Sequence, residues 1–403
     1  MPKKLVVICL INFLIAAVMG LALRYSFLSP IGLNYRFLTH AHSHVAMLGW
    51  LYLMLFLLIA HYFVPTKSLA LKRLFWITEL CVVGMMLSFP FQGYAAISIS
   101  FSTLHIFCSY YFAYLIWKKH RSKSKATEYL LKAALIFMVI STIGVWCLGP
   151  AVSIGGQASA FYQIAIQFFL HFQFNGWFLI EVIAVFFHLL QIEYSKTFKH
   201  FFTLLISSTI LTFALPLQWF APFKGLLFIN ALGVILQLAT LGMFLKIIHP
   251  NLSAFFQKKS LTIKNIYRFA LFFVVIKTIL PIITLSPNFA NVLFSHRNFI
   301  IGFIHLVMLG IISSFLLAFI GQLYFRKASM VSNFGIYAFL LGILATEILL
   351  ATQGCLFYFG KGILLNYYEL LFSFSILLPL GILLIIYQLI STKTYEQETS
   401  KTT

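Results

Sequence analysis

The stretch from residue 39 to residue 63 reads THAHSHVAMLGWLYLMLFLLIAHYF, which joins three closely spaced histidines to a long apolar run. A helix that crosses the hydrocarbon core of a bilayer needs about 20 predominantly apolar residues. Residues 45–60 contain no charged side chain, so this run is apolar enough to cross. The stretch therefore predicts a membrane-spanning helix that carries imidazole groups at one of its ends.

The rest of the chain has the same character. Of its 403 residues, 62% are apolar and 9% are charged, and the mean hydropathy is +0.99. A globular domain usually carries about a quarter charged residues. The 8 acidic residues are all Glu, and the 12 histidines outnumber them. This composition excludes a disordered chain, a soluble enzyme built on a carboxylate pair, an EF-hand protein and a P-loop protein.

Scanning for apolar runs of sufficient length gives twelve candidates. They predict an all-α, polytopic membrane protein with a single transmembrane domain over residues 1–392 and a short cytoplasmic tail over 393–403. The predicted runs are 5–26, 39–63, 73–95, 98–117, 129–149, 162–190, 201–220, 225–247, 266–286, 298–322, 333–354 and 370–391.

Once these runs are assigned as membrane spans, most Lys and Arg residues fall in the loops on one side of the membrane. Loops on one side hold 22 Lys and Arg, the other side holds 5, and Lys277 lies inside a run. Cytoplasmic loops of membrane proteins are enriched in Lys and Arg. We therefore expect a bacterial inner-membrane protein with both termini in the cytoplasm. The positive charge then faces the lipid bilayer, and no nucleic-acid partner is needed to explain it.

Four histidines are predicted to share one layer in the outer half of the membrane. His44, His105, His171 and His305 each lie about seven residues below the outer end of an even-numbered helix, or about 10 Å. Ionisable groups at such depth are costly unless they are paired or face the bundle interior, so they are functional candidates.

Three of these histidines belong to an internal repeat. The pattern His-x4-Gly occurs at His44–Gly49, His171–Gly176 and His305–Gly310, with the histidines 127 and 134 residues apart. Each interval equals one group of four helices, so we expect three pseudo-repeated groups of four. Glycine at these positions lets a helix or a flat ligand approach closely.

The chemistry of the layer favours haem. Two histidines from facing helices can hold a haem iron. The interior is rich in aromatic side chains, with 46 Phe in the chain. Haem propionates need cations near the outer surface, where Arg36 and Arg297 are expected. These residues predict a haem b site.

The layout resembles the haem–copper oxidase subunit I superfamily, which includes oxygen reductases, nitric oxide reductases and NnrS-type membrane proteins. The segment His40-Ala-His42-Ser-His44-x4-Gly49 is similar to the NnrS signature. The resemblance implies that His44 and His305 are the axial ligands of a low-spin haem. It also implies that His171 holds the place of a copper ligand, so copper or a second haem is expected there, with His105 as a helper. His40 is a further ligand or a partner of one.

The chain also departs from the oxidases. Its seventh helix lacks their histidine pair, its tenth has His305 alone, and its sixth lacks the histidine–tyrosine spacing of the oxygen reductases. We therefore expect a haem-binding membrane protein that handles electrons, nitric oxide or oxygen, working with a redox partner or a cytochrome subunit. If it is an enzyme, it is a haem-dependent oxidoreductase, but no catalytic residue is identified. A twelve-helix transporter and a non-haem metal protein are the alternatives.

Two further expectations concern buried groups. Lys277 is a candidate ion-pair partner of Glu181 or of Glu347. The five cysteines, which lie in apolar runs, are expected to be unpaired and buried: Cys9, Cys81, Cys108, Cys147 and Cys355.

Overall fold

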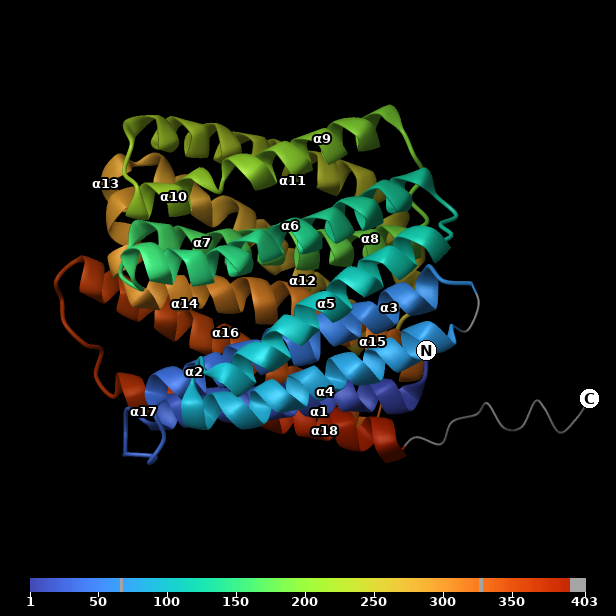
Figure 1. Ribbon diagram of the computed structural model, residues 1–403. Coiled ribbons are helices and arrows are strands. Elements are labelled where there is room, and N and C mark those ends of the chain that lie inside the picture. Colours follow the sequence, from blue (N-terminus) through green and yellow to red (C-terminus); the bar gives the residue numbers. More distant parts are fainter. Residues whose placement is uncertain (66–67, 326–328, 392–403) are drawn as a thin grey trace, which may run out of the picture.

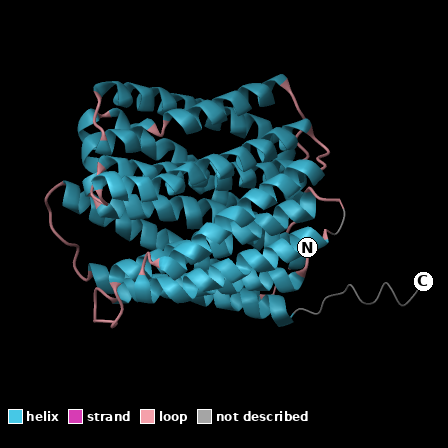
Figure 2. Cartoon of the chain, viewed as in Figure 1, coloured by secondary structure: helices cyan, strands magenta, loops and turns pink. Residues whose placement is uncertain are grey.

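The computed structural model describes residues 1–65, 68–325 and 329–391, and over these ranges it contains helices and loops but no β-strand (Figure 1, Figure 2). Twelve helices are long and apolar enough to cross a membrane, and we number them as spans 1–12. The predicted all-α, polytopic membrane fold is therefore confirmed. The predicted tail over 393–403 lies outside the described residues, as do the basic residues Lys67, Arg326 and Lys327.

Six spans are single α-helices. These are α1 (Lys3–Tyr25), α4 (Leu69–Gln92), α5 (Ala96–Lys119), α6 (Lys125–Gly155), α11 (Lys224–Gln257) and α16 (Met330–Tyr358), which form spans 1, 3, 4, 5, 8 and 11.

Three more spans contain a break that a proline explains. Span 7 joins α9 (Lys196–Leu211) to α10 (Ala214–Phe220), span 9 joins α12 (Leu261–Ile279) to η3 (Leu280–Leu285), and span 12 joins α17 (Tyr367–Ser375) to α18 (Leu377–Ser391). Proline has no N–H to donate to the carbonyl four residues earlier, so the α-helical ladder is interrupted there. The prolines are Pro216, Pro281 and Pro379.

Spans 2, 6 and 10 are each interrupted by a π-helix. Span 2 is α2 (Tyr35–His44), η1 (Val45–Tyr52) and α3 (Leu53–Tyr62); span 6 is α7 (Ala160–His171), η2 (Phe172–Phe178) and α8 (Leu179–Leu189); span 10 is α14 (Arg297–His305), η5 (Leu306–Ser313) and α15 (Ser314–Tyr324). Two short helices, α13 (Pro287–Val292) and η4 (Leu293–Ser295), connect span 9 to span 10.

The twelve predicted runs all coincide with spans, and the largest difference in length is at span 8. The run was predicted over 225–247, but α11 continues through Pro250 to Gln257. Hydropathy marks where a helix leaves the apolar layer, whereas the helix itself ends where its backbone hydrogen bonds end. A polar extension at the membrane surface is therefore missed by a scan for apolar runs.

Spans 2, 6 and 10 form the interior of the bundle. The buried share of their apolar windows is 78%, 67% and 78%, against 28–56% for the other spans. The outer spans present large apolar side chains away from the protein, such as Phe91 and Phe228, which are 76% and 78% exposed. This pattern of burial is the one expected when outer helices face lipid and surround three inner helices.

The three π-helices occur at one point of the repeat. Each begins at the residue directly after the repeat histidine, that is after His44, His171 and His305. A π-turn adds a residue to the helical ladder, and such turns occur frequently at functional sites. The predicted groups of four helices are therefore repeated in backbone geometry as well as in sequence.

The repeat glycines are contact points between helices. A Cβ at Gly176 would lie 2.6 Å from Phe137 on α6, and one at Gly310 would lie 2.3 Å from Phe273 on α12. In the first group a Cβ at Gly49 would meet Val82 on α4 at 2.7 Å and Asn12 on α1 at 3.1 Å. In every group, therefore, the second helix packs through its glycine on the first helix.

The ends of the described chain lie at the same end of the bundle (Figure 1). Lys3 at the start of α1 donates a hydrogen bond from Nζ to the carbonyl of Ile390 near the end of α18, at 3.4 Å. An even number of spans requires this arrangement.

The five cysteines are all unpaired, as predicted, but not all are buried. Cys9, Cys81 and Cys108 are buried, Cys147 is half-buried and Cys355 is exposed. The expectation of burial is wrong for Cys355 because that residue lies on a face of α16 that points out of the bundle. An apolar run identifies a span but not which of its faces meets lipid.

Substitution of Gly310 by Ala tests the glycine contact. The new methyl group would overlap the Phe273 ring, so we expect a loss of about 1–3 kcal/mol in the free energy of unfolding. The matched control is Gly242→Ala on α11, where no described atom outside the local helix backbone lies within 4 Å of the added Cβ and where Ala should stabilise the helix by up to about 1 kcal/mol. Thermal unfolding in detergent measures both. Equal effects of the two substitutions would contradict the proposed packing.

Candidate histidine sites

The four predicted histidines lie at comparable depth. His44, His105, His171 and His305 follow the first residue of their spans by eight to eleven positions. At a rise of 1.5 Å per residue this corresponds to about 12–16 Å. The layer is deeper than predicted because the spans begin before their apolar runs do.

Helix α2 presents its histidines to two different neighbours. His42 faces α1, where its Nδ1 lies 2.8 Å from the carbonyl oxygen of Ala16. A carbonyl oxygen can only accept, so Nδ1 is the donor, and Nε2 of the neutral ring keeps its lone pair. The ring packs on Gly20, where a Cβ would lie 2.9 Å from His42 Cε1. The glycine on α1 therefore makes room for this imidazole.

His305 on span 10 belongs to the same region as His42. Its electrostatic neighbours are Arg24 and His42. Glu347 on α16 completes the group, since its Oε2 lies 3.5 Å from the Cβ position of Gly302, one turn before His305. We call these four residues, His42, His305, Arg24 and Glu347, the His42–His305 site.

Cationic and aromatic side chains lie at the end of the His42–His305 site that is farther from the two chain ends. Arg24 interacts electrostatically with Tyr35, Glu347 and Arg297. The guanidinium of Arg297 lies 5.5 Å from the centroid of the Tyr35 ring. Tyr35 and Arg297 both line an open pocket of about 430 Å³ at the end of the bundle opposite the two chain ends. Because Arg297 lines this open pocket, the pocket can accept the anionic end of a ligand whose apolar part lies deeper in the bundle.

His44 faces the opposite side of α2, toward spans 3 and 4. Its Nδ1 donates to the carbonyl of His40 at 2.8 Å, and its Nε2 is 3.4 Å from the hydroxyl of Tyr94. Its ring centroid lies 4.4 Å from that of Phe89. Because Nδ1 is held by a backbone carbonyl, Nε2 of the neutral ring is an acceptor, as a metal-ligating histidine requires.

His105 on α5 accompanies His44. The two interact electrostatically, and His105 Nε2 is buried without a hydrogen-bond partner in the described part of the chain. A buried polar atom without a partner is unusual and costs free energy. His40, His44, His105 and Tyr94 are called the His44–His105 site. Arg36 is on this side too, since it acts electrostatically on both His40 and Tyr94.

His171 lies apart from both sites. Its Nε2 donates to the carbonyl of Thr209 on α9 at 2.7 Å, and the backbone carbonyl of His171 accepts a hydrogen bond from Asn175 Nδ2 at 3.2 Å. Its charged neighbour is Lys277. The predicted second centre joined His171 to His105, but His105 has His44 as its histidine neighbour. The role of His171 as a metal ligand stays a prediction.

The hydrogen bonds of the inner helices hold the sites in place. Asn12 on α1 donates to the carbonyl of Gly49 at 3.1 Å and to the carboxylate of Glu79 on α4 at 2.8 Å. Trp50 donates from Nε1 to the hydroxyl of Ser313 at 2.9 Å, which joins span 2 to span 10 below the histidine layer. These bonds connect polar groups that the bilayer interior would otherwise leave unpaired.

The predicted ion pairs of Lys277 do not form. The salt bridges between described side chains all involve Glu128, at the other end of the bundle. Both carboxylate oxygens of Glu181 and Oε1 of Glu347 are buried without a partner within the described residues. Likewise, among the described residues no three His, Cys, Asp or Glu side chains converge as metal ligands.

Residues that the sequence did not single out complete these sites. His42 points away from the face of His44, as a separation of two residues on an α-helix requires, but its neighbours on spans 1 and 10 were not foreseen. Arg24 and Tyr94 lie near predicted span ends, where basic and aromatic residues are common and carry no specific signal. The sequence did contain one signal for a site on each side of α2, namely the three closely spaced histidines His40, His42 and His44.

Comparison with known proteins adds no relative. No protein-family model matches the chain, and no curated protein matches it in sequence. The resemblance to haem–copper oxidase subunit I and NnrS-type proteins therefore rests on the histidines and glycines described above.

Substitution of His105 and His171 by Phe distinguishes a partnered imidazole from one without a partner. His171→Phe removes the imidazole donor from the Thr209 carbonyl, which keeps only a long bond of 3.5 Å from the Thr212 hydroxyl, so we expect a loss of about 0.5–1.5 kcal/mol in the free energy of unfolding. His105→Phe removes a buried nitrogen that has no partner and should leave stability unchanged or raised. Thermal unfolding of cofactor-free protein measures both. A comparable loss at His105 would mean that its Nε2 has a partner after all.

Proposed function

We propose that this chain is an integral membrane haem b protein related to haem–copper oxidase subunit I and NnrS-type proteins, which handles electrons, nitric oxide or oxygen. The observation that carries the proposal is the group formed by His42, His305 and Arg24 between spans 1, 2 and 10. Two histidines from different inner helices, at similar depth and with a cation beside them, suit a haem iron held from both faces.

His42 and His305 would hold the iron. The carbonyl of Ala16 fixes the His42 ring and leaves Nε2 as the free nitrogen, which is how second-shell bonds orient metal ligands. Gly20 supplies the space that the ring needs. Arg24 and Arg297 would neutralise the propionates at the outer mouth. The pair His44–His305, expected from the sequence, is the rival assignment on the same two helices.

A bound haem supplies one-electron transfer between its ferric and ferrous states. The protein's own residues exclude water and set the local charge. Apolar helices surround the site, and Glu347 offers a carboxyl group beside Arg24. A site of this kind exchanges electrons with a redox partner at the outer mouth.

A second candidate function is non-haem metal binding at the His44–His105 site. The unpartnered Nε2 of His105 beside His44 supports it. Copper suits imidazole ligands of this kind. The transporter alternative receives less support, because transporter folds commonly repeat in halves, whereas here the π-helices repeat on spans 2, 6 and 10.

The absorption spectrum tests the haem proposal. Dithionite-reduced protein, produced with ample haem, should show Soret and alpha bands. His42→Ala and His305→Ala should each abolish the low-spin haem signal, whereas His44→Ala should keep it. His249→Ala, at an exposed position on α11, is the matched control. Iron, copper and zinc contents measured on the same samples report the second site.

The outcomes separate the rival assignments. Loss of the signal in His44→Ala with retention in His42→Ala would establish the His44–His305 pair and reject ours. A colourless wild-type protein would reject haem altogether. Copper that disappears in His105→Ala while haem remains would support a separate metal at the His44–His105 site.

We also propose that both termini face the cytoplasm of a bacterial inner membrane, on the basis of the 22 to 5 division of basic residues between the two sides. A fluorescent protein fused after the C-terminus should then fold and fluoresce, and a fusion in the loop between spans 11 and 12 should not. The reverse pattern would overturn this orientation.

A further inference from the structure

Lys277 is a buried cation without a counterion. It lies on α12 and is 5% exposed, yet no carboxylate interacts with it within the described residues. An ammonium group inside a membrane protein is costly unless something pairs with it. The titratable side chain that interacts with Lys277 electrostatically is His171, and an imidazole cannot supply a negative charge.

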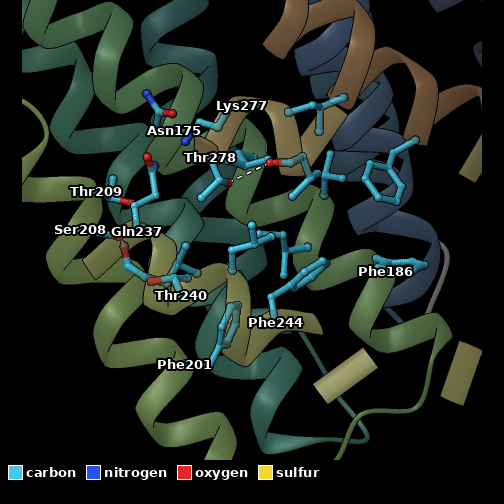
Figure 3. A pocket seen from close by; sticks show the side chains of 18 residues that line it. Asn175, Phe186, Phe201, Ser208, Thr209, Gln237, Thr240, Phe244, Lys277 and Thr278 are labelled. Carbon is cyan, nitrogen blue, oxygen red and sulfur yellow. Dashed lines mark hydrogen bonds between the residues drawn. The ribbon is translucent and has the colours of Figure 1, made fainter. Parts of the chain in front are cut away.

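A cavity lies beside this lysine. It has a volume of about 50 Å³ and is lined by residues of spans 6, 7, 8, 9 and 10. One water occupies about 10–15 Å³ on this measure, so the cavity holds about three to five water-sized groups. Apolar side chains, including Phe201 and Phe244, form one wall, and polar side chains gather at the other (Figure 3).

The polar wall is rich in donors. The nitrogen of Lys277 points to the side where Asn175 and Gln237 lie (Figure 3). Within the described part of the chain, neither Lys277 nor the Gln237 amide has a hydrogen-bond partner, and Asn175 uses one of its two N–H groups on the His171 carbonyl. The hydroxyls of Thr240 and Thr278 donate to carbonyls of their own helices.

We propose that this cavity binds one small monovalent inorganic anion, of the size of chloride or nitrite. Lys277 supplies the charge, and the amides of Gln237 and Asn175 supply further donors. Among the described residues, no carboxylate lines this cavity, so no negatively charged side chain on its wall repels an anion. This site is separate from the His42–His305 site and does not depend on haem binding.

Direct binding tests the proposal on the full-length protein. Equilibrium dialysis of radioactive chloride, in gluconate buffer at constant ionic strength, should give one anion per chain. Addition of nitrite should displace the chloride. A much stronger competition by nitrite identifies an oxyanion as the preferred ligand, and weak competition identifies a halide. No saturable chloride or nitrite binding would overturn the proposal.

Substitution at Lys277 locates the site. Lys277→Met keeps the chain length but removes the charge, so it should abolish anion binding. In gluconate it should also unfold at a higher temperature than the wild type, because the uncompensated charge is gone. Chloride should raise the unfolding temperature of the wild type by several degrees and leave that of Lys277→Met unchanged.

The matched control is Lys246→Met, at an exposed lysine on α11, the helix that also supplies Gln237. This variant should bind the anion as the wild type does. If Lys277→Met still bound chloride with unchanged affinity, the anion would bind elsewhere and the assignment to this cavity would be wrong.

Discussion

The close packing of three glycines is the contact on which the interior of this protein depends. Gly49, Gly176 and Gly310 bring each inner span against the first helix of its group, where a larger residue would overlap a neighbour. Close approach also allows Asn12 to reach the Gly49 carbonyl and Glu79. Because lipid offers no hydrogen bonds, polar groups inside the bundle must find partners in the protein. Tight packing and polar pairing therefore occur together.

The position of α2 between two neighbours explains how one short sequence serves two histidine sites. His42 is directed to spans 1 and 10, and His44 to spans 3 and 4. Residues two apart on an α-helix differ by about 200° in direction, so they cannot share a ligand on one face. The bond from Trp50 to Ser313 fixes spans 2 and 10 relative to each other just below this layer.

The number and order of the spans could be predicted because apolar length alone identifies a membrane-spanning helix. The layer of histidines followed from the same boundaries. The partners of each histidine could not be predicted, since they depend on which helices touch. His105 was expected to assist His171, but its neighbour is His44. Lys277 forms no ion pair with Glu181 or Glu347, the two partners considered for it. The depth of a residue follows from its position along its own helix, whereas its neighbours depend on how two helices pack against each other.

The π-helices after His44, His171 and His305 have a consequence for how this protein can change. One residue inserted into an α-helix rotates everything beyond it by about 100°. The half of each inner span that precedes the π-helix is therefore out of angular phase with the half that follows it. Side chains on the half before the π-helix, the repeat histidines among them, can be exchanged without altering the faces that the half after it packs into the core. Each inner span therefore carries its repeat histidine on a segment that is separated by a π-helix from the helix that follows.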